Sequence, residues 1–334
     1  MSTHFFGLKD WMFQYSHSIG RNEYGGTGFR NPMDMALGAD DVVYVLNRSR
    51  EDRPDGVHVS MCTIDEHYIT EFGSFGEGDG QFIWPTAMTL DSDGNVYVAD
   101  ELLNRITVYN KDGDFIRKWG KAGSGNGELD KPAGLAASED GVMYVSDNRN
   151  HRIQKFTLDG KYLGQFGSFG SGQGQLNMPW GIGLDKDGNV YVADWRNDRV
   201  QAFTPDGQWQ ASFGRSGKGI GEFNRPNGVA VDKDGIIYVV DWMNHRVQIL
   251  NRDGRHITTL KGDHVLSQWG RDKLASNPDM VQQRAIAMAW DSSGEKHFSL
   301  PCAVKVDDQN RIAVLENIRG RIQVYRKTNT PVLV

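Results

Sequence analysis

The chain has 334 residues, of which 38% are hydrophobic and 24% are charged, and its formal net charge is −6 at pH 7. This acidic balance argues against a nucleic-acid-binding protein, because such a surface normally carries a basic face. The absence of any run of about 18 apolar residues excludes a membrane-spanning helix, and two cysteines in different repeats indicate no disulfide framework.

The N-terminal residues 1–10 show no basic region that leads into a long apolar run, so they do not read as a signal peptide. Together with the low cysteine content, this predicts a cytoplasmic protein that is not attached to a membrane. Residues 15–20 follow, with the sequence Tyr-Ser-His-Ser-Ile-Gly. Similar apolar-Gly endings recur further along the chain, as in Phe72-Gly73 and Phe166-Gly167.

Six copies of one unit then fill most of the chain. Each copy starts with a proline; the six are Pro32, Pro85, Pro132, Pro179, Pro226 and Pro301. From Pro85 to Pro226 these prolines are 47 residues apart, and each is followed by an apolar run, an Asp-Gly turn and a Tyr-Val-x-Asp stretch or a close variant. A period of this length, built from short β-type runs and turns, is typical of propeller blades. We therefore predict an all-β, six-bladed β-propeller that occupies residues 1–334 as a single domain.

Four strands are expected in each blade, but the last copy provides three before the chain stops. The apolar-Gly ending of residues 15–20 resembles the fourth strand of the other copies. We expect this N-terminal segment to complete blade six beside residues 320–326. A ring closed in this way has no open sheet edge between its two ends.

An Asp and an Arg recur five residues apart in four copies. The pairs are Asp100 and Arg105, Asp147 and Arg152, Asp194 and Arg199, and Asp241 and Arg246. Four copies at equivalent blade positions cannot all belong to one active site. We therefore predict a structural role, in which each carboxylate pairs with its arginine across the loop between strands two and three.

The interval between the last two prolines is 75 residues instead of 47, so residues 261–298 contain an insertion. Asn277 followed by Pro278 is a typical helix start, and Val281, Ala285 and Met288 form one apolar stripe at helical spacing. A helix in this place either packs onto the tops of the blades or forms a lid over the mouth of the channel.

An aromatic group is expected on the same face of the ring. Trp180 follows its blade proline, and Trp195 and Trp242 each follow the repeated Asp. These indoles either fill the tapered ring or line a pocket for an apolar, aromatic or cationic ligand. The nearby Arg48, Arg149 and Arg196 are candidates for holding an anionic group.

Asp34 and His297 are the candidate acid–base residues for such a pocket. The glycine-rich runs Gly76–Gly80 and Gly123–Gly127 recur once per blade and precede a proline-led strand instead of a helix. They therefore lack the context of a phosphate-binding loop, and we expect no nucleotide cofactor.

Residues 222–249, from Glu-Phe-Asn-Arg-Pro-Asn-Gly-Val-Ala-Val-Asp to Arg-Val-Gln-Ile, resemble the NHL-repeat family, and the likeness extends over nearly all of residues 15–326. The resemblance implies a six-bladed propeller. It leaves the function open, because the family includes scaffolds, RNA-binding domains and a peptidyl-hydroxyglycine amidating lyase, and one fold hosts unrelated chemistries.

The residue that follows each blade proline distinguishes two kinds of propeller enzyme, the amidating lyase and the gluconolactonase-like hydrolases. Here the six positions hold Met33, Thr86, Ala133, Trp180, Asn227 and Cys302. The amidating lyase has zinc-binding histidines there, so that activity is disfavoured. In gluconolactonase-like propellers these positions supply an Asn and an Asp to calcium; Asn227 matches the Asn, and Asp34 lies one residue beyond the expected place. The resemblance therefore implies a candidate calcium site at Asn227 and Asp34.

The leading hypothesis is a propeller that binds a small, partly apolar ligand at the lidded channel face and catalyses a lyase or hydrolase step there. The main alternative is a scaffold without activity, in which the Trp and Arg residues contact a protein partner. A third alternative, RNA binding, is disfavoured by the net charge.

Overall fold

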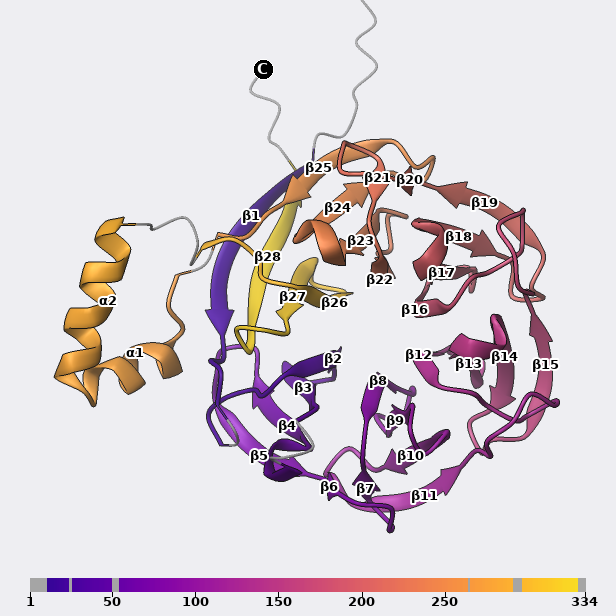
Figure 1. Ribbon diagram of the computed structural model, residues 1–334, viewed down its shortest axis with the longest axis horizontal. Coiled ribbons are helices and arrows are strands. Elements are labelled where there is room, and N and C mark those ends of the chain that lie inside the picture. Colours follow the sequence, from indigo (N-terminus) through magenta and orange to yellow (C-terminus); the bar gives the residue numbers. More distant parts are fainter. Residues whose placement is uncertain (1–10, 24–25, 50–53, 264, 291–295, 330–334) are drawn as a thin grey trace, which may run out of the picture.

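The computed structural model describes residues 11–23, 26–49, 54–263, 265–290 and 296–329. Six four-stranded antiparallel sheets stand around a central axis like blades (Figure 1). The predicted six-bladed β-propeller is therefore confirmed. In this described part, no helix is long and apolar enough to cross a membrane.

Each blade runs from an innermost strand at the axis to an outermost strand at the rim. The innermost strands all begin at the predicted prolines; they are β2 (Pro32–Leu37), β8 (Pro85–Leu90), β12 (Pro132–Ala137), β16 (Pro179–Leu184), β22 (Pro226–Val231) and β26 (Pro301–Val306). The second strands are β3 (Val42–Asn47), β9 (Val96–Asp100), β13 (Val142–Asp147), β17 (Val190–Asp194), β23 (Ile237–Asp241) and β27 (Arg311–Glu316).

The outer half of each blade contains the remaining two strands. The third strands are β4 (His58–Thr63), β10 (Arg105–Tyr109), β14 (Arg152–Thr157), β18 (Arg199–Phe203), β24 (Arg246–Leu250) and β28 (Arg321–Asn329). The outermost strands are β5 (Tyr68–Phe72), β11 (Phe115–Trp119), β15 (Tyr162–Phe166), β19 (Trp209–Phe213), β25 (His256–Leu260) and β1 (Trp11–Ile19). Short parallel pairs between blades join β6 (Ser74–Phe75) to β7 (Gln81–Phe82) and β20 (Arg215–Ser216) to β21 (Glu222–Phe223).

The N-terminal strand β1 closes the ring, as predicted. It pairs antiparallel with β28, from Trp11 opposite Asn329 to Ile19 opposite Ile322, and so starts earlier than the predicted residue 15. The Tyr15 ring packs edge-on against Tyr325 within the blade, with 5.7 Å between ring centroids. This pairing covers the edge of β28 and gives blade six four strands, like the other blades.

The closing blade is also attached to blade five. Lys327 of β28 is buried, and its ammonium forms ion pairs with Asp232 and, at 2.7 Å, with Asp234. The Asp232 carboxylate accepts a further hydrogen bond from the Tyr238 hydroxyl at 2.9 Å. A buried ion pair contributes when its charges have further hydrogen-bond partners, as they do here.

The repeated carboxylates are structural hubs. The Asp147 carboxylate accepts hydrogen bonds from the backbone N–H of Asp130 at 2.7 Å and from the side chains of Asn150 and Arg152, both at 2.8 Å. Arg152 in turn donates to the carbonyl of Gly125 at 2.7 Å, in the loop that enters the blade. The predicted Asp–Arg ion pairs are present in blades three, four and five, and Glu316 with Arg321 repeats the arrangement in blade six.

Blade two departs from this arrangement. The Asp100 carboxylate accepts backbone N–H groups of Ile83, Trp84, Leu102 and Leu103 at 2.6–3.1 Å, and Arg105 donates to backbone carbonyls instead. No ion pair joins Asp100 and Arg105, although both lie in the described part of the chain. The carboxylate is nevertheless satisfied, because four donors surround it.

A second repeated contact joins neighbouring blades. The residue before the blade proline is left-handed in five copies, with φ of 53° at Met178, although a following proline disfavours any helical conformation. The N–H of Met178 donates to Nδ1 of His151, in the loop of the preceding blade, at 3.0 Å. Asn104, Asp198 and His245 accept the same hydrogen bond in other blades. These acceptors hold an unfavourable backbone conformation in place.

The insertion between blades five and six forms two helices, α1 (Gln268–Ala275) and α2 (Pro278–Trp290). The predicted helix start is correct, since Oδ1 of Asn277 accepts a hydrogen bond from the N–H of Asp279 at 3.2 Å. The helices lie outside the ring beside β1 (Figure 1), so the prediction that they pack on the blade tops or cover the channel is wrong. The apolar residues Val281 and Ala285 of α2 are exposed.

Two contacts explain this position of the helices. Trp269 of α1 is buried in the core between blades one and six, where its ring lies 6.0 Å from that of Phe29. The buried Glu66 accepts hydrogen bonds from the first N–H groups of α1, at Gln268 (2.5 Å) and Trp269 (3.2 Å), and from Gly20 at 2.8 Å. A carboxylate at a helix N-terminus is favourable, and this one fixes α1 to the side of blade one.

Deletion of residues 1–20 is expected to destabilise the whole ring, because it exposes the edge of β28 and the face of Tyr325. The melting temperature, measured by differential scanning calorimetry, should fall by at least 10 °C, and the protein should become prone to aggregation. A variant that lacks residues 1–10 retains all of β1 and serves as the matched control. An unchanged melting temperature in the longer deletion would show that β1 does not close the ring.

His151 is expected to make folding stability depend on pH. Burial lowers the pKa of this imidazole below its usual 6.5, and its Nδ1 must stay unprotonated to accept the Met178 N–H. The unfolded chain therefore binds the proton more readily, so the stabilisation is complete above pH 6.5 and is lost as the pH falls through the lower folded-state value. His151→Asn keeps an acceptor, as Asn104 does in blade two, and should make the decrease in stability between pH 7 and pH 5 smaller in urea unfolding. An identical decrease in the variant would contradict this role.

Candidate functional site

One end of the channel holds a cavity of about 210 Å³. Two repeated positions supply its walls, namely the residue after the blade proline and the residue after the acid that ends the second strand. The lining residues are Met33, Trp180, Trp195, Asn227, Trp242, Cys302 and Asn317. The three tryptophans predicted to share a pocket are therefore brought together, and Asn227 lies with them.

The indoles are positioned by the carboxylate hubs described above. Trp195 begins the short helix η3 (Trp195–Asn197), directly after Asp194, and Trp242 begins η4 (Trp242–Asn244), directly after Asp241. The rings of Trp180 and Trp195 pack at 5.7 Å between centroids with an angle of 42°. An aromatic pair of this kind forms a stiff wall with a large apolar area.

Asn227 contributes a polar atom to this wall. Its Oδ1 is buried, and no described residue donates a hydrogen bond to it. A buried acceptor without a donor costs about 1–3 kcal/mol. A ligand that donates an N–H or O–H group in the cavity would remove that cost.

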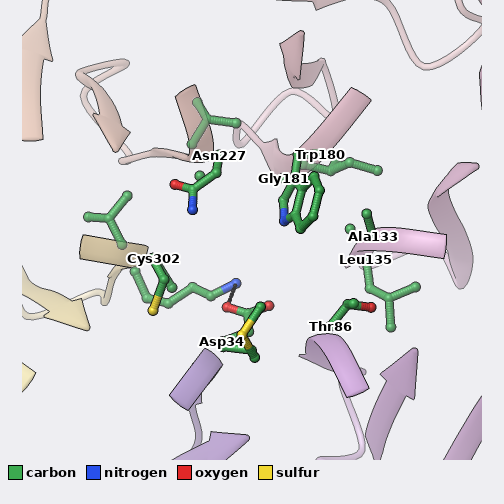
Figure 2. Close-up of a pocket in the computed structure, with 16 residues that line it drawn as sticks. Asp34, Thr86, Ala133, Leu135, Trp180, Gly181, Asn227 and Cys302 are labelled. Carbon is green, nitrogen blue, oxygen red and sulfur yellow. Dashed lines mark ion pairs between the residues drawn. The ribbon is translucent and has the colours of Figure 1, made fainter. Parts of the chain in front are cut away.

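Asp34 lies deeper in the channel, where its carboxylate is already engaged (Figure 2). Its Oδ1 accepts the N–H of Met35 at 2.8 Å, its Oδ2 accepts the N–H of Met88 at 2.9 Å, and Lys305 approaches Oδ1 to 3.5 Å. Asp34 is therefore held as an ion-paired carboxylate, and it does not line the tryptophan cavity. The geometry therefore does not support the predicted role of Asp34 in proton transfer.

The candidate calcium ligands do not fit a metal site. Asn227 and Asp34 project from different sides of the channel, and the Lys305 ammonium pairs with the carboxylate (Figure 2). Calcium requires several oxygen ligands and no competing cation at its carboxylate. Within the described ranges, no group of three His, Cys, Asp or Glu residues is arranged to hold a metal ion.

The channel narrows at the Asp34–Lys305 ion pair to a space of about 30 Å³. Beyond this constriction, the opposite end opens into a second cavity of about 260 Å³. The ends of the innermost strands line it, including Leu37, Leu90, Leu184 and Val306, together with Lys305. The two cavities therefore meet at the ion pair.

The other predicted site residues lie apart from the cavity wall. His297 is exposed, and its carbonyl accepts a hydrogen bond from Arg321 at 3.4 Å, so the structure does not bring its side chain into the cavity. Arg149 is exposed on η2 (Asn148–Asn150) and does not line the cavity. Arg48 forms an ion pair with Glu101 at 2.8 Å and lies 4.7 Å from the ring centre of Trp84.

Arg196 lies next to the tryptophan wall, as its place after Trp195 suggests. Its guanidinium is 5.1 Å from the ring centre of Trp195, and the guanidinium of Arg225 is 4.5 Å from the same ring. These distances are typical of cation–π contacts. Arg225, which precedes a blade proline, was not anticipated from the sequence.

Met33 and Asn317 are further cavity residues that were not predicted from the sequence. The repeat contains the signal for both, since Met33 follows a blade proline and Asn317 follows the acid Glu316, as Trp195 follows Asp194. Cys302 is a wall residue of limited reactivity. Its Sγ donates to the carbonyl of Pro32 at 3.2 Å, and burial raises its pKa well above the usual value.

Sequence comparisons identify two family models within the chain. Residues 120–214 match the SMP-30/Gluconolactonase/LRE-like region, and residues 223–250 match the NHL repeat. No curated protein matches the chain by sequence. The NHL match lies in the segment on which the resemblance was based, and it supports that resemblance for residues 223–250.

Solved structures with the same fold include enzymes and a protein of unknown function. Virginiamycin B lyase from Staphylococcus aureus, solved with quinupristin, is 15% identical, with a TM-score of 0.54 over 97% of this chain and 90% of that one. A Bacteroides thetaiotaomicron protein of unknown function is 21% identical, with a TM-score of 0.63 over 95% and 76%. A gluconolactonase from Xanthomonas campestris is 14% identical, with a TM-score of 0.57 over 94% and 87%. At these identities the likeness concerns the fold.

Asn227→Leu is expected to stabilise the protein, because it replaces an unpaired buried amide by an apolar side chain of similar size. The free energy of unfolding in urea should rise by about 1 kcal/mol. Asn224→Leu, in the loop before the same proline, is the matched control. It shows the general effect on stability of replacing an amide side chain by an alkyl side chain. A loss of stability on Asn227→Leu would show that the amide is satisfied in the folded protein.

Proposed function

We propose that this NHL-type propeller binds a small, partly apolar ligand in the tryptophan cavity and hydrogen-bonds it through Asn227. The observation that carries the proposal is an unpaired buried acceptor set in an aromatic wall. Apolar walls with a few convergent polar groups are the usual composition of small-molecule sites. The apolar part of the ligand would contact the indoles, and its donor group would pair with Oδ1 of Asn227.

The shape of the site favours a small molecule over a protein partner. A scaffold would present its tryptophans on a flat exposed patch, whereas Trp180, Trp195 and Trp242 are all partly buried around a concave space of about 210 Å³. That volume accepts a group of the size of one substituted aromatic ring. The helical insertion lies at the side of the ring, so the site we propose has no lid from α1 or α2.

A lyase or hydrolase step is the second candidate, and it is favoured by the activities of the virginiamycin lyase and the gluconolactonase. The chain's own residues give it less support. Asp34 is engaged by Lys305 and two backbone N–H groups, and His297 is exposed away from the wall. We therefore propose binding as the function that the geometry supports best.

The neutral probe 4-hydroxyphenylacetamide tests the proposal, since it combines one aromatic ring with a hydroxyl donor. Binding measured by ligand-observed NMR should have a dissociation constant on the order of 1 mM, as expected for a fragment of this size. Trp195→Leu combined with Trp242→Leu should weaken it at least tenfold, because each lost aromatic contact costs about 1 kcal/mol.

Trp209→Leu, on the outermost strand β19, is the matched control and should leave the affinity unchanged. Circular dichroism should show that all these variants remain folded. A folded double variant that binds the probe as tightly as the parent protein would place the ligand site elsewhere.

A further inference from the structure

Two cations adjoin the tryptophan cavity without a carboxylate partner. The guanidinium groups of Arg196 and Arg225 both contact the ring of Trp195, at 5.1 Å and 4.5 Å from its centre. Neither forms an ion pair with a carboxylate of the residues that the structure describes. Nη1 of Arg225 is buried, and it has no hydrogen-bond acceptor among those residues.

Asp198 contacts the backbone of Arg225 but forms an ion pair with neither arginine. Asp198 follows η3, and its carboxylate accepts the backbone N–H of Arg225 at 2.7 Å. Some arginines at other blade positions do have acidic partners, since Arg48 pairs with Glu101 and Arg199 with Asp194. In a chain with a net charge of −6, two arginines without acidic partners beside one cavity are a local positive site.

Both arginines are held in place by elements of the fold. The backbone N–H of Arg196 donates to the carbonyl of Asn177 at 3.0 Å, and Arg225 occupies the left-handed position before Pro226, with φ of 57°. Stacking on Trp195 restricts their side chains further, so less freedom is lost when they bind an anion. An arginine also offers several N–H donors, which suit a carboxylate, sulfonate or phosphate.

We infer that the ligand of the tryptophan cavity is an amphipathic anion, with an apolar or aromatic body against the indoles and an acidic group at Arg196 and Arg225. This inference rests on the proposed function and adds the charge of the ligand to it. It also separates the two edges of the site: Asn227 pairs with a donor on the ligand body, and the two arginines pair with its anionic end.

The test compares 4-hydroxyphenylacetate with 4-hydroxyphenylacetamide, which have the same body and differ in charge. The carboxylate should bind about tenfold more tightly at low salt, and the difference should shrink as the ionic strength rises. Arg225→Gln and Arg196→Gln should each weaken binding of the carboxylate more than binding of the amide, and so reduce the preference for the carboxylate. Arg149→Gln is the matched control, because Arg149 occupies in blade three the position that Arg196 occupies in blade four, next to Asn148 instead of a tryptophan.

The outcomes separate the two claims. Equal binding of both probes, abolished by the Trp195→Leu and Trp242→Leu changes, would overturn the anion inference and leave the cavity as the site. Binding of neither probe would overturn the proposed function. A preference for the carboxylate that survives both glutamine substitutions would place the anionic group away from Arg196 and Arg225, and so would also overturn the inference.

Discussion

The buried side chain at the end of the second strand is the residue on which the rest of each blade depends. It is a carboxylate in blades two to six and the amide of Asn47 in blade one. In blade four, Asp194 receives the backbone N–H of Asn177 from the entering loop, the amide of Asn197 from its own short helix, and the guanidinium of Arg199 from the third strand. One side chain thus fixes three segments of the chain relative to one another. Because charged hydrogen bonds of this kind are short and directional, the residue after the carboxylate is held towards the channel. The position of the residues in the cavity wall therefore depends on this buried carboxylate.

This arrangement separates the residues that build the ring from those that vary around it. The hubs repeat, whereas the positions after the acid hold Trp195, Trp242 and Asn317 in blades four to six, and Arg48, Glu101 and Asn148 in blades one to three. Two of these six positions are thus aromatic, in the neighbouring blades four and five, and the other four are polar or charged. Since the backbone at each position is fixed by its own blade, the chemistry of the mouth depends on a few side chains and not on the fold.

The sequence predicted the ring and its closure because both depend on local, repeated patterns. A proline, an Asp-Gly turn and a Tyr-Val-x-Asp strand are independent of distant residues, and the missing fourth strand of blade six could be found by counting. The position of the helical insertion could not be predicted in this way. It depends on Glu66 and on the contact of Trp269 with Phe29, which join segments far apart in the chain. The same limit applies to the site. The shared pocket of Trp180, Trp195 and Trp242 follows from blade order, whereas the ion pair between Asp34 and Lys305 joins the neighbouring blades one and six, whose sequences lie far apart in the chain.

The ion pair between Asp34 and Lys305 affects which molecules can pass through the channel of the ring. The space that this pair lines is about 30 Å³, whereas the cavities on either side of it have about 210 Å³ and 260 Å³. A ligand of the size of an aromatic ring therefore has room at either end of the channel but not in its middle. The tryptophan cavity and the apolar cavity would then be filled from opposite faces of the ring.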